Sequence, residues 1–204
     1  DYFLHRMNQT ELFEGKAVVI QPRMGGKCAL LSAQGCKYNL YARGIRNGEI
    51  VNEHTFIESI SRCLVPYKGF GSYIALADNP AFRFIISNTP EACIAFSENC
   101  RFTDTPCTGF PAKLTQLLYR RYQKGLRGFI LLPCELIDNN ADALKKCVLQ
   151  YAELWQLEDG FAYCLRIGDC TVYELTSYLI LRFGETVARQ FLSDSQMRNY
   201  RKRV

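Results

Sequence analysis

Short apolar runs alternate along this chain with segments of helical spacing, and this alternation limits the folds that the chain can adopt. The runs lie at residues 17–20, 83–87 and 128–132. Short runs rich in β-branched and aromatic residues predict strands that are buried on both faces. Because such strands form parallel sheets whose faces are covered by helices, the sequence predicts an α/β fold, a parallel sheet flanked by helices.

Three segments of helical spacing lie beside these runs. Residues 113–123 carry leucines three and four positions apart behind Pro111, and residues 141–156 and 2–13 have similar patterns. Proline favours the first turn of a helix, so the first of these helices is expected to begin near Pro111. Lys113 falls in that same turn, where the helix dipole disfavours a cation, and it therefore predicts an anionic neighbour.

A β-hairpin is predicted outside the alternating pattern. Asn47-Gly48 separates residues 38–46 from residues 49–51. Both turn residues tolerate the left-handed backbone that a two-residue hairpin loop requires, which makes this pair the strongest short-range turn signal in the chain.

Polar or proline-marked segments follow each predicted strand, at residues 21–23, 88–91 and 133–135. In open parallel sheets, ligands bind in the crevice beyond the carboxyl ends of the strands. These three segments are therefore candidates for ligand contact. Asn, Thr and Pro also make ordinary turns, so the position of the segments does not by itself distinguish a ligand site from simple connections.

Several chemistries lack their usual signals. No strand is followed by G-x-G-x-x-G, and the chain has no P-loop, no G-x-S-x-G and no H-E-x-x-H. The ten cysteines form no C-x-x-C pair, and neither His5 nor His54 lies near two cysteines at ligand spacing. We therefore expect no metal site, with the cysteines free in a reducing cytoplasm.

Charge and hydropathy exclude two further classes. The formal net charge is +5, and four of the surplus positive charges lie among the last seven residues. A nucleic-acid groove needs cations spread over a folded face, so we expect no nucleic acid as a partner. The chain has neither an apolar run long enough to span a bilayer nor a signal peptide at its start, and we expect no membrane association.

Three motifs resemble the tagaturonate reductases, also called altronate oxidoreductases, of the mannitol dehydrogenase or polyol-specific long-chain dehydrogenase family. They are RFIISNTPEA at residues 83–92, FPAKLT at 110–115 and PCELIDNNADAL at 133–144. Their order and intervals are similar to those of the family, and the resemblance covers roughly residues 1–157. It implies an N-terminal Rossmann-type NAD domain, followed in the family by a mostly helical catalytic domain.

The resemblance also implies hydride transfer between a nicotinamide and a sugar acid, tagaturonate with NADH giving altronate. It places Gln21 and Arg23 at the adenine ribose, Asn88, Thr89 and Glu91 on the nicotinamide side, and Cys134 with Glu135 at the floor of the cleft. Cys134 could instead simply pack at the strand end. NAD enzymes usually carry a carboxylate at the ribose, and its absence beside Arg23 leaves the choice between NAD and NADP open.

The departures from the family pattern limit what this chain should do alone. We expect residues 1–167 to be a partial Rossmann-like domain that lacks the first βα phosphate-binding unit. Residues 168–204 would be a helical extension with a basic tail, helices at 171–181 and 185–192, and no likeness to the family. The family's catalytic lysine motif, K-x-x-x-x-N-x-x-H, is absent, because Arg46 and Val51 precede His54 at the two required positions.

We therefore predict no catalytic residue in this chain and no turnover by the chain alone. A catalytic domain further along the protein, or a separate partner chain, would have to supply the proton-transferring base. The alternative is a non-catalytic binding or interaction module built on a Rossmann remnant.

Overall fold

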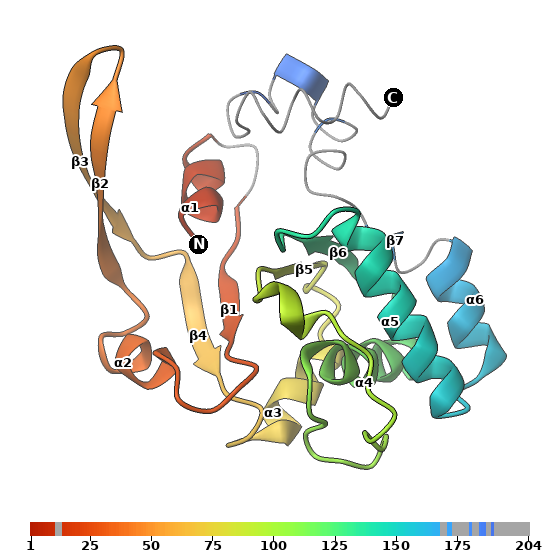
Figure 1. The fold of residues 1–204 in the computed structure, drawn as a ribbon. Helices are drawn as coiled ribbons and strands as arrows, with labels where there is room; N and C mark the ends of the chain where they lie inside the picture. The colour runs from red at the N-terminus through yellow and green to blue at the C-terminus, as the bar shows by residue number, and fades with distance from the viewer. Residues whose placement is uncertain (11–13, 168–170, 173–179, 181–183, 187–188, 190–204) are drawn as a thin grey trace. The chain divides into compact units, whose positions relative to one another are not determined.

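A computed structural model describes residues 1–10, 14–167, 171–172, 180, 184–186 and 189. The chain divides into two compact units, residues 1–73 and 74–204 (Figure 1), and each is described by itself. No helix among these residues is long and apolar enough to cross a bilayer. The domain boundary predicted at residue 167 stays a prediction.

The first unit contains a pair of parallel strands. β1 (Ala17–Ile20) pairs with β4 (Ile60–Leu64), and α2 (Cys28–Ala33) packs against β4. α1 (Tyr2–Gln9) precedes them, and the carboxylate of Asp1 caps it by accepting a hydrogen bond from the backbone N–H of Tyr2. The strand predicted at residues 17–20 is therefore confirmed, whereas its partner β4 was not predicted.

A long β-hairpin also belongs to the first unit (Figure 1). β2 (Tyr38–Arg46) pairs antiparallel with β3 (Glu49–Ile57), so the predicted second strand, residues 49–51, was too short. The turn residues Asn47 and Gly48 have φ angles of 53° and 84°. These left-handed angles are the ones that a two-residue hairpin turn requires, which confirms the predicted turn. The short helix α3 (Phe70–Ile74) ends one residue beyond the division between the units.

The second unit contains a three-stranded parallel sheet with β6 at its centre. β5 (Phe84–Ser87) and β7 (Thr171–Val172) flank β6 (Ile130–Pro133). Two 3-10 turns, η1 (Ala75–Asp78) and η2 (Glu91–Cys93), lie before and after β5. The predicted strands at 83–87 and 128–132 are confirmed, the second starting two residues later and ending one residue later than predicted.

Three helices accompany this sheet (Figure 1): α4 (Phe110–Gln123), α5 (Asn140–Leu154) and α6 (Asp159–Ile167). α5 packs against β6, α4 and α6, so it connects the sheet to the other helices. The helices predicted at 113–123 and 141–156 are confirmed, and α4 carries Pro111 in its first turn. The α/β fold with parallel strands flanked by helices is thus the observed architecture.

One prediction about the C-terminal part is wrong. Thr171 and Val172, expected to begin a helix, instead form β7 and pair in parallel with Ile130 and Leu131. Backbone groups along the edge of β6 pair with these two residues, and β-branched Thr and Val favour a strand. Residues 184–186 are helical. The remainder of the predicted helices at 171–181 and 185–192 lies outside the described residues, apart from the isolated positions 180 and 189.

The interior of the second unit contains a buried arginine. The Arg121 side chain is 2% exposed, and its guanidinium donates hydrogen bonds to the carbonyl oxygens of Ala77, Asn79, Phe82 and Arg127. The guanidinium carbon also lies 4.5 Å from the centre of the Phe129 ring. Arg121 thereby connects α4 to the segment before β5 and to the segment before β6.

Candidate functional site

The carboxyl ends of β5 and β6 lie side by side. Ser87 and Pro133, the last residues of the two strands, are paired in the parallel register. The backbone N–H of Cys134 donates to the carbonyl of Ser87 at 2.8 Å, which continues the ladder one residue beyond β6. Two of the three strand exits selected from the sequence therefore meet at one edge of a sheet, as the crevice rule for parallel sheets requires.

A carboxylate connects these two exits. Oε1 of Glu135 accepts hydrogen bonds from the backbone N–H and from the hydroxyl of Thr89, both at 3.1 Å. Glu135 is only 3% exposed, and its Oε2 is buried without a hydrogen-bond partner among the described residues. We call this arrangement the Thr89–Glu135 clasp. It holds the β5 exit to the β6 exit and leaves one buried acceptor oxygen available.

Asn140, at the start of α5, supports the clasp from behind. Its side-chain amide donates to the carbonyls of Pro133 and Glu135, at 2.9 and 3.1 Å. Its Oδ1 is buried and has no hydrogen-bond partner within the described part of the chain. Sequence reasoning missed this residue as a functional candidate, although it falls inside the PCELIDNNADAL motif. Its position at a helix start gave no sign that it would brace the preceding strand exit.

Cys134 is half-buried between the strand end and Glu135. Its thiol makes a weak contact with the carbonyl oxygen of Leu132 at 3.6 Å. Burial, together with the negative charge of Glu135, raises the pKa of the Cys134 thiol to about 11. The side chain is therefore a neutral thiol near pH 7 and unsuited to act as a nucleophile.

The remaining candidates of the second unit are open to solvent. Asn88 and Glu91 are both exposed, on either side of Thr89 and Pro90. Glu91 begins the short turn η2. The structure thus brings Thr89, Cys134 and Glu135 together and leaves Asn88 and Glu91 on the surface of the same strand exit.

The other two candidates, Gln21 and Arg23, lie in the first unit at the end of β1. The Gln21 side chain bridges its own loop: its amide N–H donates to the carbonyl of Arg23 at 2.7 Å, and its Oε1 accepts from the backbone N–H of Cys28 at 3.1 Å. A Cβ on Gly26 would collide with this amide, so a larger residue there would displace the Gln21 side chain. Arg23 itself is exposed.

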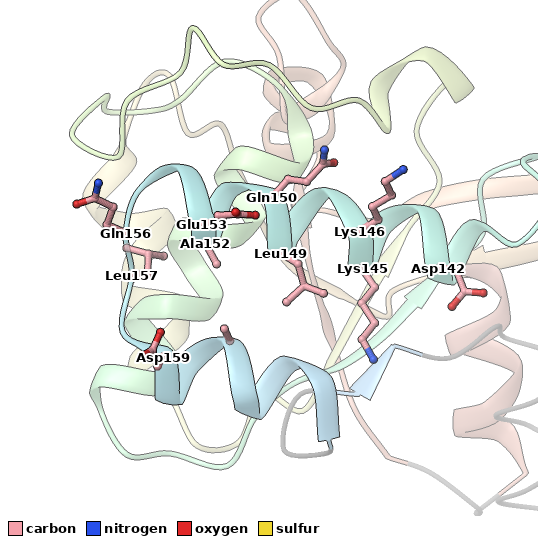
Figure 2. Close-up of a pocket in the computed structure, with 11 residues that line it drawn as sticks. Asp142, Lys145, Lys146, Leu149, Gln150, Ala152, Glu153, Gln156, Leu157 and Asp159 are labelled. Carbon is pink, nitrogen blue, oxygen red and sulfur yellow. The ribbon is translucent and has the colours of Figure 1, made fainter.

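A further hollow of the second unit lies elsewhere. It is a groove of about 760 Å³ between α5 and α6, and none of the seven predicted site residues lines it. Figure 2 shows Lys145, Lys146 and Glu153 of α5 around it, with Asp159 at the start of α6. Side chains of opposite charge on the two helices line this groove, and they indicate no particular ligand. We therefore assign the candidate site to the strand exits.

Comparison with solved structures defines the class of fold. The chain matches a mannitol 2-dehydrogenase of Pseudomonas fluorescens, solved with NAD and D-mannitol, with a TM-score of 0.69 and 18% sequence identity. The match covers 84% of this chain and 36% of the mannitol 2-dehydrogenase chain. It also matches a D-sorbitol dehydrogenase in substrate-free form, with a TM-score of 0.64 and 14% identity. The fold is therefore the Rossmann-type fold found in polyol dehydrogenases.

Sequence comparison is more specific, although no model of a known protein family matches the chain. The chain is 46% identical over 187 residues to the altronate oxidoreductase of Bacillus subtilis, covering 90% of this chain and 39% of the relative. Altronate oxidoreductases of Phocaeicola vulgatus and Yersinia enterocolitica match at 42% and 41% identity over 79% and 81% of this chain. These matches confirm the resemblance found in the three motifs: over the matched residues the chain is homologous to altronate oxidoreductases. It spans between a third and two fifths of the length of these relatives.

Proposed function

We propose that this chain forms part of the dinucleotide-binding region of an oxidoreductase of the tagaturonate reductase type. The observation that carries the proposal is the identity of 46% over 187 residues to an altronate oxidoreductase. In the proposed reaction, tagaturonate, NADH and a proton give altronate and NAD⁺. NADH, when bound, supplies the hydride that reduces the carbonyl carbon.

The strand exits of the second unit support the cofactor part of this proposal. The buried Oε2 of Glu135 is an acceptor without a partner among the described residues. The other carboxylate oxygen, Oε1, accepts a hydrogen bond from the backbone N–H of Thr89 and so holds the side chain in place. A hydroxyl or amide of a nucleotide ligand could satisfy such an oxygen, as dinucleotides bind at this edge of open parallel sheets. We assign Asn88, Thr89 and Glu91 to the nicotinamide side, and Cys134 with Glu135 to the floor of the cleft.

The strand exit of the first unit supports the adenine end. Arg23 is exposed and available for a ligand, whereas the Gln21 amide is occupied within its own loop. We therefore propose that Gln21 shapes the loop that presents Arg23 to the ribose. An arginine at this position is suited to the 2′-phosphate of NADP. A binding measurement therefore decides between NAD and NADP.

The proposed setting is the cytoplasm, with a sugar acid and a nicotinamide dinucleotide as small-molecule ligands. All nine cysteines whose state is described are free thiols, which supports a reducing compartment. The base that transfers the substrate proton is assigned to a part of the protein outside this chain, or to a partner chain.

Fluorescence titration of the full-length protein with NADH and NADPH tests the proposal. We expect micromolar binding, a free energy of about −8 kcal/mol. We also expect Arg23→Ala to weaken NADPH binding more than NADH binding, with the exposed Lys68→Ala as a matched control. Absence of binding up to about 1 mM of either dinucleotide, or absence of tagaturonate-dependent NADH oxidation, contradicts the proposal.

A further inference from the structure

A cluster of potential metal ligands lies in the second unit, in the loop before α4. The Sγ atoms of Cys100 and Cys107 and a carboxylate oxygen of Asp104 all lie within 4.8 Å of one another. Both cysteines are buried, at 2% and 0% exposure, and Asp104 is half-buried. The cluster thus has an enclosed sulfur side and a side that solvent can reach.

The loop that carries these ligands is held in place by the neighbouring helices. Nε2 of Gln116, on α4, donates to the carbonyls of Phe102 and Asp104, both at 2.8 Å. Nε1 of Trp155, at the end of α5, donates to the carbonyl of Cys100 at 2.8 Å. Because the backbone is fixed on both sides, the three ligand atoms converge without ordering a loose segment, which lowers the cost of binding.

The present contacts of the ligand atoms can give way to a metal. The Cys107 thiol donates to the carbonyl of Arg101 at 3.1 Å, and the Cys100 thiol makes a weak contact with the carbonyl of Thr108 at 3.8 Å. Oδ2 of Asp104 accepts from the backbone N–H of Arg101 at 2.9 Å, so coordination through Oδ1 would preserve that bond. Two sulfurs bound to one Zn²⁺ in tetrahedral geometry are about 3.8 Å apart. The Sγ atoms of Cys100 and Cys107 lie within 4.8 Å of each other, so a shift of roughly 1 Å at most brings them to that distance.

The surrounding charge favours a divalent cation bound by two thiolates. Lys113 is 2% exposed in the first turn of α4, and its ammonium donates to the carbonyl of Gly109 at 3.2 Å. Two thiolates and one carboxylate carry three negative charges, which a divalent cation and Lys113 together balance. The anionic neighbour that Lys113 predicts from its place in the helix stays a prediction.

We propose that Cys100, Asp104 and Cys107 form a binding site for a single Zn²⁺ ion, with a water molecule as the fourth ligand. The ligand set of two thiolates and one carboxylate suits Zn²⁺ better than Mg²⁺ or Ca²⁺, which prefer oxygen ligands alone. The site lies in the loop between η2 and α4, and its role is to cross-link residues 100–107 within that loop. It goes beyond the proposed reductase function and departs from the expectation that the sequence contains no metal site.

Sequence reasoning missed this site for a definable reason. The two cysteines are seven positions apart with the aspartate between them, which matches no familiar zinc spacing. Only the folded loop brings the three side chains together.

Titration of the full-length protein with Co²⁺, kept reduced with a non-chelating phosphine, tests the proposal. We expect one equivalent of Co²⁺ per chain with a thiolate-to-cobalt absorption band, which Zn²⁺ then displaces. Cys100→Ser and Cys107→Ser should abolish the band. Cys36→Ser is the matched control and should retain it, since Cys36 is a buried cysteine of the other unit, with its Sγ 3.9 Å from that of the half-buried Cys63.

A milder substitution keeps the test decisive if the serine variants fold poorly. Asp104→Asn retains an acceptor for the Arg101 N–H and should weaken Zn²⁺ binding roughly tenfold or more without changing the far-ultraviolet circular dichroism. Absence of a cobalt–thiolate band in the reduced wild-type protein overturns the proposal. So does a band that persists in Cys107→Ser, a band lost in Cys36→Ser, or an unchanged affinity in Asp104→Asn.

Discussion

Replacing Glu135 by alanine tests the Thr89–Glu135 clasp directly. The substitution removes the one oxygen that accepts from both the backbone N–H and the hydroxyl of Thr89. A hydrogen bond to a charged group contributes about 1.5–3 kcal/mol, so losing two should lower the local stability of the β5 exit by at least about 3 kcal/mol. Since a factor of ten corresponds to about 1.4 kcal/mol, the local opening equilibrium should rise roughly 150-fold.

Amide hydrogen exchange on the full-length protein measures this opening. The Thr89 amide should exchange about two orders of magnitude faster in Glu135→Ala, provided that exchange there occurs by local opening. Glu98→Ala is the matched control, because Glu98 is an exposed glutamate of the same unit. Exchange in peptides from α4 should be unchanged in both variants.

Two graded variants separate the two bonds of the clasp. Thr89→Val removes only the hydroxyl and should cost about half as much as Glu135→Ala. Glu135→Gln retains Oε1 as an acceptor without its charge, so exchange at Thr89 should rise by only about tenfold. If Glu135→Ala leaves the exchange rate of the Thr89 amide unchanged, the clasp does not hold the strand exit and the reasoning fails.

Three other measurements test further parts of the structure. Arg121→Met leaves four backbone carbonyls without their donor and should destabilise the full-length protein by about 4 kcal/mol or more in thermal melts, with no rescue by Arg121→Lys. Gly26→Ala should displace the Gln21 amide and cost about 2 kcal/mol in denaturant titrations, but clearly less in a Gln21→Ala background. Cys134, with a pKa of about 11, should be alkylated at pH 8 roughly a hundredfold more slowly than an ordinary exposed thiol, and its alkylation should become faster as the pH rises toward 11. Mass spectrometry measures the alkylation rate, and the exposed Cys93 is the control. An Arg121→Lys variant as stable as the wild type would contradict the role of the guanidinium. Additive stability losses for Gly26→Ala and Gln21→Ala would contradict their contact, and equal alkylation rates for Cys134 and Cys93 would contradict the raised pKa.

The local pattern of the sequence is sufficient to predict most of the secondary structure near the candidate site. The apolar runs before residues 88 and 133 become β5 and β6, because several consecutive apolar residues predict a strand locally. The predicted burial on both faces is wrong for β5, in which Ile86 is 61% exposed. The Asn-Gly pair gives the hairpin turn, because its backbone requirement is local. β4 escaped prediction because Ser61 and Arg62 interrupt its apolar residues, and its pairing partner β1 is distant in the sequence.

Contacts between distant residues could not be predicted. Thr89 and Glu135 were both candidates because each follows a strand, but nothing in the sequence indicates a bond across the intervening 46 positions. Arg121 looks like a solvated charge near the end of a helix, and only the folded chain shows the carbonyls that surround it. Such contacts depend on how the elements pack, whereas periodicity and turn signals report only local preference.

The structure also changes which predicted residues remain available to a ligand. The strand-exit rule selects Gln21 and Glu135 by position, yet the nitrogen and the oxygen of the Gln21 side-chain amide both form hydrogen bonds within residues 21–28. Glu135 uses one carboxylate oxygen internally and retains the other. A ligand at the β1 exit would therefore have to displace two existing hydrogen bonds to contact the Gln21 side chain. The exposed Arg23 side chain can contact a ligand without breaking these bonds. We therefore expect Arg23→Ala to alter dinucleotide preference while Gln21→Ala lowers affinity for NADH and NADPH equally, through the shape of the loop.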